Sequence, residues 1–463
     1  MDTLTAVLSR YIAQTKFEDI PADTVEYAKL LIMDSIGCAI GGSRLKPGEL
    51  VIDFFTQLGG CPEAAILATG KKLPCITAAY VNSYLANVLD FDDTFSLAFG
   101  HPGATIIPPG VALAEKIRAS GKQLIVAVVT AYEGWGRINQ AIAASPERRA
   151  KVFGLGTHQI FGAAIVCSKL MGFNSEQTAN ALGIAGANAP VPSVRKQGLD
   201  DRPVNWVKNN FGWASMGGVL AALLTEEGFL GHRYILDGEK GFWIMSGSDR
   251  CHFDKMTLNL GTHYLIRNTG FKPYASCRWT HSSLDATATI MAKHTVQPDR
   301  ITHIKVATIG EVVNGFGFAN PRNIVDAQFS LPYLIALELL GKSPRRGLSA
   351  DDLTDHNVCS IAAKVSLEIS PEMEERFQEN KKFSSAEVSI EQIDGTVFSE
   401  RVDIPKWDPE TAPTREALYG KFADLTAPII GKSVSQAVAD DLEHLENIAD
   451  VSSIISRIST ISK

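Results

Sequence analysis

Apolar residues up to about Gly261 recur at three- and four-residue spacing, the period of an amphipathic helix. Proline and glycine, as at Pro21, Gly41 and Pro108, mark where such helices begin, end or bend. The segments with the clearest helical period are residues 6–14, 24–40, 76–89, 106–119 and 124–138. This part of the chain is therefore predicted to be all-helical.

The pattern changes after about residue 263. Apolar and polar positions alternate, which is typical of half-buried strands, and a hairpin is expected to turn at Asp394–Gly395. The expected strands are residues 301–310, 362–370 and the two arms of 386–404, with a helix at 331–341. From about Thr414 the helical period returns.

These patterns together predict a mainly α protein of two domains. A large all-helical domain is expected over residues 1–265 and a smaller α+β lid domain over residues 266–413. Residues 414–463 are expected to pack back on the helical domain, which would make the α+β part an insertion.

Composition narrows the class of protein. The chain has 463 residues, is 45% hydrophobic and 21% charged, and carries a formal net charge of −7. The acidic excess is spread along the chain and offers no basic face, so nucleic acid is not an expected partner. Uncharged stretches such as residues 94–114 are interrupted by prolines, so no membrane partner is expected either.

The seven cysteines are odd in number and widely spaced, and no Cys-x-x-Cys occurs. We interpret them as reduced thiols of a cytosolic protein. The first twenty residues lack the pattern of a secretory or transit peptide, so a cytoplasmic location is expected. P-loop, zincin and α/β-hydrolase motifs are missing, and the histidines are scattered, so neither a metal nor a cofactor is expected.

The first concentration of unusual residues is LDFDDTFSLAFGHPGATIIPP. Asp90, Asp92, Asp93 and Thr94 follow an apolar helix, and His101 stands just before a predicted helix start. Carboxylates this close repel one another, so at least one should be paired, cap a helix or have a raised pKa. The free N–H groups of a helix start beside His101 favour a site for an anion. The alternative is a solvated turn in which an Asp caps the helix.

The same segment matches D-x-D-x-T, the pattern of haloacid-dehalogenase-type phosphatases, in Asp90, Asp92 and Thr94. That chemistry needs the first Asp at the end of a buried parallel strand. Residues 76–89 have a helical period instead, so this interpretation is disfavoured.

The second concentration is TGFKPYASCRWTHSSLD, residues 269–285. Lys272, Ser276, Arg278 and His281 stand where a helix is expected to begin. Cations, hydroxyls and an imidazole at a helix start can bind a carboxylate. The alternative is a basic linker with a capping serine.

A third group surrounds Lys208, which stands between Trp206 and Asn209 before a helix rich in small residues. A buried ammonium there could bind a carboxylate or, with a lowered pKa, move a proton. The alternative is a lysine whose stem lies on apolar surface while its ammonium stays in water. His158 precedes another predicted helix.

In this order, these groups resemble the MmgE/PrpD (2-methylcitrate dehydratase) family, which also contains cis-aconitate decarboxylase and iminodisuccinate epimerase. The resemblance covers nearly the whole chain. It rests on DFDDT and GHP (Asp90–Thr94, Gly100–Pro102), FGAA (Phe161–Ala164), LGIAG (Leu182–Gly186), KPYASCRWTH (Lys272–His281) with Asp285, and FSLPY (Phe329–Tyr333).

The resemblance implies a homodimer with a metal-free cleft between the two domains that binds small di- or tricarboxylates. By the family pattern the site is lined by Asp90, Thr94, His101, Lys272 and Tyr333, with Lys208 as the counterpart of a second lysine. Two departures occur. Lys208 requires a one-residue gap, and Phe153 stands where several members have a histidine, with His158 one turn nearer the helix.

We therefore expect a lyase that abstracts a proton next to a carboxylate. His101 is the expected general base or acid, oriented by Asp90, and fixed cations hold the enolate-like charge. The expected catalytic residues are His101, Asp90, Lys272, Lys208 and Tyr333. The residues expected to bind the substrate are Thr94, Asp93, Ser276, Arg278, His281 and His158.

Three outcomes are open to such a site: loss of a β-hydroxyl is dehydration, loss of CO₂ is decarboxylation, and return of the proton on the other face is epimerisation. Of the three reactions, dehydration is expected first, because the largest part of the family is named after it. An alternative of another class is a carboxylate-binding protein without catalysis, because a fold does not fix a function.

Overall fold

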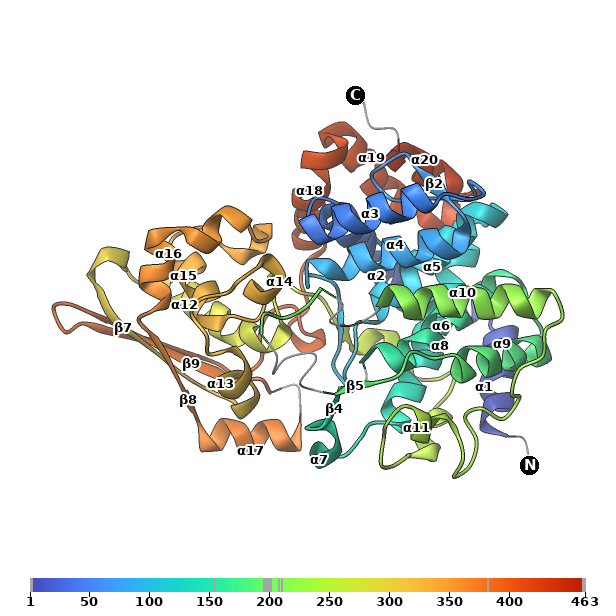
Figure 1. Ribbon diagram of the computed structural model, residues 1–463, viewed down its shortest axis with the longest axis horizontal. Coiled ribbons are helices and arrows are strands. Elements are labelled where there is room, and N and C mark those ends of the chain that lie inside the picture. The colour runs from blue at the N-terminus through green and yellow to red at the C-terminus, as the bar shows by residue number, and fades with distance from the viewer. Residues whose placement is uncertain are drawn as a thin grey trace.

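Figure 1 shows the computed structural model of the chain, which describes residues 3–153, 155–194, 202–206, 209, 211–380 and 383–459. The protein is mainly α-helical and has two large hydrophobic cores. One lies among the helices on the right of Figure 1, and the other lies between a four-stranded sheet and its helices on the left. The predicted fold class, a large helical domain with a smaller α+β domain, is confirmed.

The larger domain is built mainly from helices of the first half of the chain. They are α1 (Leu4–Gln14), α2 (Ala22–Gly42), α3 (Lys46–Leu58), α4 (Cys75–Val88), α5 (Pro102–Ile117), α6 (Gly121–Ala141), α7 (Pro146–Arg149), α8 (Leu155–Leu170), α9 (Ser175–Ala187), α10 (Phe211–Glu226) and α11 (Phe242–Met245). Small residues let α8 and α10 approach closely. A Cβ on Gly218 would lie 2.4 Å from the Cβ of Ala163, so glycine is required there.

Short strand pairs connect these helices. They are β1 (Ala64–Ala65) with β2 (Lys72–Leu73), β3 (Thr94–Phe95) with β6 (Thr269–Gly270), and β4 (Val152–Phe153) with β5 (Ser193–Val194). The pair β3–β6 is antiparallel and sets Thr94 opposite Gly270. It therefore brings together the two sequence segments that carry most of the predicted site residues.

The smaller domain has one sheet in the order β10-β9-β7-β8, formed by β7 (Ile301–Thr308), β8 (Val365–Ile369), β9 (Ala386–Gln392) and β10 (Val397–Val402). Its helices are α12 (His281–Lys293), α13 (Gly310–Phe316), α14 (Ile324–Ala327), α15 (Leu331–Leu339), α16 (His356–Ala362) and α17 (Pro371–Glu379). β9 alternates between buried and less buried positions, so one face of the sheet packs on the core. Gly395 has a φ of 82° in the predicted hairpin turn.

The last helices are α18 (Arg415–Ile430), α19 (Lys432–Glu443) and α20 (Ser452–Ser459). Their apolar residues, among them Phe422, Leu442 and Ile455, belong to the larger core. Figure 1 accordingly places α18 beside α2, next to the N-terminal helices. The domain boundaries that the sequence predicts, at residues 265 and 413, stay predictions.

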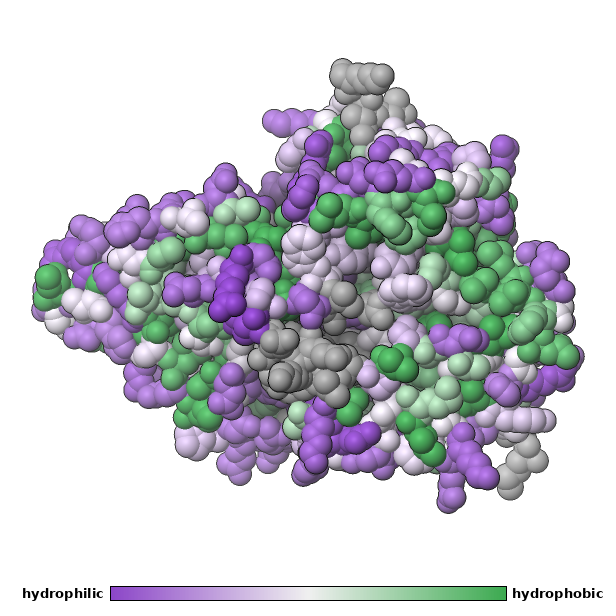
Figure 2. Space-filling model, viewed as in Figure 1, coloured by the Kyte–Doolittle hydropathy of each residue, from purple (hydrophilic) through white to green (hydrophobic). Residues whose placement is uncertain are grey.

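The surface carries few features that bear on partners. Apolar side chains gather over α3, where Phe54 and Leu58 are exposed (Figure 2). All seven cysteines are free thiols. Among the described residues, no helix is both long and apolar enough to cross a bilayer. The expected homodimer and the expected cytoplasmic location stay predictions.

Candidate active site

A cavity of about 340 Å³ lies between the two cores. Phe95 of the larger core lines it together with Phe316 and Phe329 of the smaller core. Its charged lining residues are the basic His101, Arg149, Arg250, Lys272 and Arg278 and the acidic Asp90 and Asp408. Basic side chains outnumber acidic ones, so the cavity suits an anion.

The acidic segment begins where α4 ends. Asp90 adopts a positive φ of 53°, a conformation that aspartate tolerates better than most residues, and its N–H donates to the carbonyl of Asn87. This turn directs the chain into the protein rather than across its surface. Asp90, Asp92 and Asp93 are at most 2% exposed, which excludes the solvated turn considered from the sequence.

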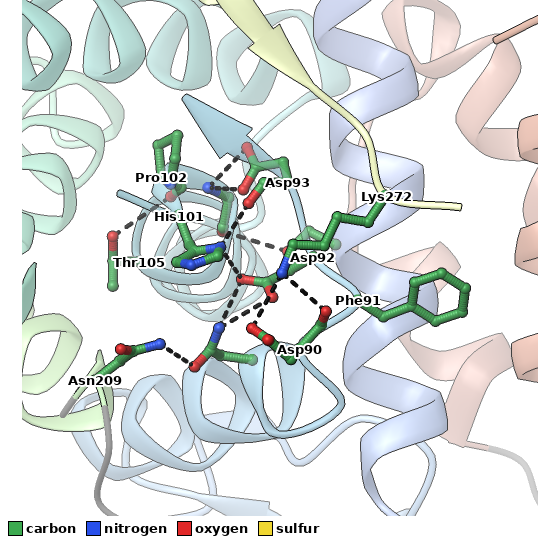
Figure 3. Close-up of polar contacts among 12 residues, drawn as sticks. Asp90, Phe91, Asp92, Asp93, His101, Pro102, Thr105, Asn209 and Lys272 are labelled. Carbon is green, nitrogen blue, oxygen red and sulfur yellow. Dashed lines mark hydrogen bonds and ion pairs between the residues drawn. The ribbon is translucent and has the colours of Figure 1, made fainter. Parts of the chain in front are cut away.

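Lys272 provides the cation for this segment (Figure 3). It follows β6 and is fully buried. Its Nζ donates to the carbonyl oxygen of Asp90 at 2.8 Å and to the Oδ1 of Asp90 at 3.0 Å. A buried ammonium is stable only when paired, and Asp90 supplies two acceptors for it.

Amides hold the second carboxylate. The Nδ2 of Asn87 lies 3.0 Å from both oxygens of Asp92, and the Nδ2 of Asn209 donates to the Oδ1 of Asn87 at 2.9 Å. Figure 3 shows Asn209 and Asp92 on opposite sides of this link. No separate role for Asp92 or Asn209 was predicted, because hydrogen-bond networks of this kind join residues that are far apart along the chain.

His101 is the residue that caps α5. Its Nδ1 lies 2.8 Å from the carbonyl oxygen of Asp93 and 3.7 Å from the Oδ2 of Asp92. A carbonyl only accepts hydrogen bonds, so Nδ1 carries a proton and Nε2 is the basic nitrogen of the neutral ring. The contact that fixes Nδ1 comes from the main chain of Asp93, and the orienting role expected of Asp90 stays a prediction.

Asp93 binds the start of α5. Both of its oxygens accept the N–H of Gly103, and its Oδ2 accepts the hydroxyl of Tyr132 at 2.7 Å. A Cβ on Gly103 would lie 2.8 Å from Asp93 Oδ1, which explains the glycine. Burial and the nearby Asp92 raise the pKa of Asp93 to about 8. Asp93 is therefore a helix cap, and it does not line the cavity as a substrate ligand.

A second buried ion pair lies behind the acidic segment. Lys421 of α18 donates to the carbonyl of Phe91 at 2.6 Å and contacts Asp34 Oδ1 of α2 at 2.6 Å. Its ammonium also lies 4.1 Å from the ring centroid of Phe91. Burial alone would lower the pKa of Lys421, but the carboxylate of Asp34 raises it, so the lysine stays charged. The only signal in the sequence was Asp34, the single charge in the apolar run of residues 30–42, and nothing marked Lys421 as its partner.

The remaining predicted residues divide into two sets. Thr94 and Arg278 line the cavity, and Arg278 donates to Asp408 at 2.7 Å. Lys208 lies outside the described residues, as does the side chain of Phe153.

Ser276 and His281 are fully buried at the start of α12. The hydroxyl of Ser276 pairs with that of Thr280 at 2.9 Å, and His281 Nε2 lies 3.2 Å from the carbonyl oxygen of Ser276. Burial lowers the pKa of His281 well below its usual value. Neither residue lines the cavity, so both support the start of α12 rather than contact a ligand there.

His158 and Tyr333 are not among the residues that line the cavity. His158 lines an adjacent pocket of about 100 Å³ and accepts the indole N–H of Trp135 at 3.1 Å. Burial lowers its pKa to about 3, so it is neutral near pH 7. Tyr333 is 1% exposed in the smaller core, and burial raises the pKa of its hydroxyl. Its placement in the site is therefore not supported by the structure.

Two family models cover most of the chain. The MmgE/PrpD N-terminal domain matches residues 6–252, and the MmgE/PrpD C-terminal domain matches residues 274–445. The chain belongs to the MmgE/PrpD family. The resemblance noted in the sequence is thereby confirmed, and the cavity lies between the parts of this MmgE/PrpD protein that the two models match.

Curated relatives of this MmgE/PrpD chain are named as decarboxylases. The cis-aconitate decarboxylase of Aspergillus terreus is 25% identical over 98% of this chain and 95% of its own length. The cis-aconitate decarboxylase of Mus musculus is 24% identical over 99% of this chain and 93% of its own. The cis-aconitate decarboxylase-like protein oryM of Aspergillus oryzae is 26% identical over 98% of this chain and 97% of its own length.

One group in this MmgE/PrpD cavity has the donors of a metal site. Among the described residues, Asp90, Asp92 and His101 bring one ligand atom each to within 4.8 Å of one another. The ammonium of Lys272 already contacts Asp90, and the amide of Asn87 contacts Asp92. The structure thus supplies the positive charge for this cluster from a lysine, in the place where a divalent cation would otherwise neutralise it.

Proposed function

We propose that this chain is a lyase that removes CO₂ from a small unsaturated tricarboxylate of the cis-aconitate type. One observation carries the proposal: His101, which can exchange a proton, and Lys272, a buried cation, line the same cavity. A proton donor beside a fixed positive charge is the arrangement that carbanion chemistry next to a carboxylate requires.

The size and charge of the cavity support a small polyanion as substrate. Its volume of about 340 Å³ is at the lower end of the range for small-molecule sites. Arg149 and Arg250 lie in its lining together with Ala143 and Ala144, away from the acidic segment in sequence. Arg149 pairs with Glu311 at 3.3 Å, and Arg250 donates to the carbonyls of Ala143 and Ala144. Because a guanidinium has five N–H donors, a substrate carboxylate can share each group with these contacts, so a substrate with several carboxylates suits the lining.

The proposed step balances without a further reactant. In cis-aconitate, one carboxylate is borne by a CH₂ group next to a carbon–carbon double bond. When that carboxylate leaves as CO₂, its bonding electrons form a new double bond, and the old double bond moves its electrons to the far alkene carbon. This carbon, which also bears a carboxylate, then takes a proton.

His101 supplies that proton and Lys272 stabilises the charge in our proposal. Because Nδ1 donates to the carbonyl of Asp93, proton exchange occurs at Nε2, and the main-chain contact holds the ring in one orientation. The Lys272 Nζ, 3.0 Å from the Oδ1 of Asp90, lowers the energy of the enolate-like intermediate. Asp90 is in this scheme the partner of the lysine.

The names of the relatives are the reason for preferring decarboxylation. Dehydration of a 2-methylcitrate-like hydroxy acid, which the sequence put first, uses the same base and the same cation. Epimerisation of an iminodisuccinate-like acid does so too. The three reactions differ in the leaving group, and the reaction products distinguish them directly.

The test is incubation of the purified chain with cis-aconitate, 2-methylcitrate, citrate and iminodisuccinate in deuterated water, with chelator present, followed by NMR. We expect CO₂ release from cis-aconitate and one deuterium at the former alkene carbon of the product. A protein with His101→Asn is the control and should release CO₂ at least about a hundredfold more slowly. Loss of water from 2-methylcitrate without CO₂ release would make the protein a dehydratase, and no reaction with any acid would overturn the proposal.

A further inference from the structure

A second and larger concavity lies in the smaller domain. It has a volume of about 790 Å³ and is bordered by α12, by the end of α15 and by the loop of residues 341–349. Its basic lining residues are Lys293, Lys342, Arg345, Arg346 and Lys406, and its acidic ones are Glu338 and Asp352. We call it the basic cleft. Its positive excess stands out in a chain whose net charge is −7.

The loop that carries most of these cations has a defined conformation. Gly341 and Gly347 bound it with φ values of 71° and 91°, which residues other than glycine rarely adopt. Between them Pro344 is buried, and the hydroxyl of Ser343 accepts the N–H of Arg345. The loop is thereby fixed on the domain, and its basic side chains extend from it.

Not all of the positive charge is neutralised within the protein. Lys342 contacts Asp352 and Asp355, and Lys293 contacts Glu400. Arg346 and Lys406 are exposed, and neither side chain forms an ion pair with any residue that the structure describes. Glu338 interacts electrostatically with Arg345 and Lys406, and water solvates the exposed cations. An anion of two or more charges would replace that water with charge-assisted hydrogen bonds.

We propose that the basic cleft binds a phosphate-bearing small molecule and that this ligand regulates the cavity between the domains. Neighbouring arginine and lysine side chains match phosphate oxygens, which accept several charge-assisted hydrogen bonds at once. The volume of the cleft accommodates a ligand of nucleotide size. Pyrophosphate, ATP and inorganic phosphate share this chemistry and differ in charge and size.

A chain of contacts connects the basic cleft to the active-site segment. Arg345 Nη2 donates to the hydroxyl of Tyr274 at 2.8 Å, and that hydroxyl donates to Asp285 at 2.9 Å. The N–H of Lys406 donates to the other oxygen of Asp285, and the N–H of Ala275 donates to the carbonyl of Pro344 at 3.0 Å.

The two ends of this series of contacts lie next to residues that line the active-site cavity. Tyr274 is two positions from Lys272, and Lys406 is two positions from Asp408, which pairs with Arg278. A phosphate that draws Arg345 away from Tyr274 removes a contact that holds the lysine-bearing segment. We therefore expect the ligand to inhibit, and this second step rests on the proposed function.

Binding is tested by isothermal titration calorimetry of the full chain with pyrophosphate, ATP and inorganic phosphate. Tricarballylate, an anion without phosphate, is titrated in parallel at the same ionic strength. The test variant combines Arg346→Glu with Lys406→Glu, and the matched control is Lys432→Glu, an exposed lysine on α19. We expect the Kd for the phosphate ligands to rise at least tenfold in the test variant and to stay unchanged in the control.

The outcomes separate the basic cleft from the active site. A protein with His101→Asn should bind the phosphate ligands as the unchanged protein does, because His101 lies in the other cavity. Equal affinity in the test variant and the control would overturn the proposal, as would tighter binding of tricarballylate than of pyrophosphate. Because calorimetry needs no turnover, a failure of the proposed function leaves this test intact.

Regulation is tested separately by kinetics at saturating pyrophosphate. We expect kcat/KM to fall several-fold in the unchanged protein and not in the test variant. An unchanged kcat/KM with measurable binding would overturn the regulatory step and leave the binding site.

Discussion

Lys272 places its Nζ 2.8 Å from the main-chain oxygen of Asp90 and 3.0 Å from the Oδ1 of the same residue. One lysine therefore binds both the backbone and the side chain of a residue whose φ is 53°. Its removal is expected to affect the shape of the acidic turn as well as its charge. This double contact motivates the first prediction.

Lys272→Met should lower turnover at least a hundredfold and destabilise the protein by about 3–5 kcal/mol, because the Asp90 carboxylate stays buried without the lysine's charge. The double variant Lys272→Met with Asp90→Asn should regain part of that stability and none of the turnover. Urea unfolding and steady-state kinetics on the single and double variants measure both effects.

The matched control is the exposed pair Lys305–Glu368, whose side chains are 50% and 52% exposed. Lys305→Met should change stability by less than about 1 kcal/mol. A double variant as unstable as Lys272→Met alone would show that the lysine stabilises the protein through contacts other than the carboxylate of Asp90.

His101→Asn should lower turnover by about 10²–10⁴-fold with little change in fold, because asparagine also suits the helix cap but cannot exchange a proton near pH 7. The limb of the pH–rate profile that belongs to the imidazole should disappear in the variant. His303→Gln, on the exposed face of β7, is the control and should leave the profile unchanged. A residual rate within tenfold of the unchanged protein would remove His101 from the mechanism.

Tyr333→Phe should leave kcat and KM within about twofold. Among the described residues its hydroxyl has no hydrogen-bond partner, so the loss of this hydroxyl should leave stability unchanged or raise it by about 1 kcal/mol. Tyr274→Phe is the comparison, because that hydroxyl contacts both Asp285 and Arg345, and its loss should cost about 1–3 kcal/mol. A hundredfold loss of turnover in Tyr333→Phe would restore the role that the sequence predicts for it.

His158 should make the protein sensitive to acid. Burial lowers its pKa from the ordinary 6.5 to about 3, so below pH 6.5 the unfolded chain binds a proton that the folded chain does not. Stability is then lost as the pH falls from 6.5 toward 3, by about 2 kcal/mol between pH 8 and pH 5. Chemical unfolding at these two pH values should show this loss.

The variant His158→Asn isolates that contribution. Asparagine can accept the indole N–H of Trp135 but does not titrate in this range. The difference in stability between pH 8 and pH 5 should be smaller in the variant by about 2 kcal/mol. An equal pH dependence in both proteins would assign the acid sensitivity to other groups.

Much of the fold was predictable because most helices bury one stripe and most strands bury one face. The strand at 301–310 and the hairpin at Asp394–Gly395 follow this rule, and both are confirmed. The site was predictable where chemistry-bearing residues cluster along the chain. Asp90, His101, Lys272 and Arg278 indeed line one cavity.

Some predicted site residues do not line the cavity, and they lie where the hydrophobic pattern does not indicate a direction. Every residue of α15 is buried, so the period could not tell which side Tyr333 occupies. The first seven residues of α12 are all buried too, which gave His281 the same ambiguity. Asp93 was assigned to the substrate because its own helix cap lies ten positions away, at Gly103.

The residues that the sequence did not indicate act over long separations. Lys421 contacts Asp34 and the carbonyl of Phe91 across more than 300 positions. Asp34 is the single charge in the apolar run of residues 30–42, which indicates that it has a partner but not that the partner is Lys421. Only the assembled core selects it.

The hydrogen bond from Lys421 to Phe91 can form only late in the synthesis of the chain. The acidic segment leaves the ribosome long before Lys272, and longer still before Lys421, which lies near the end of the chain. At roughly 5–20 residues per second, synthesis of the intervening chain takes tens of seconds. Until Lys421 is made, the acidic segment has at most the first of its two lysines, and Asp34 lacks its buried partner. The ion pair behind the segment can therefore form only once α18 has been made, and a nascent chain that stops before α18 holds the segment through Lys272 alone.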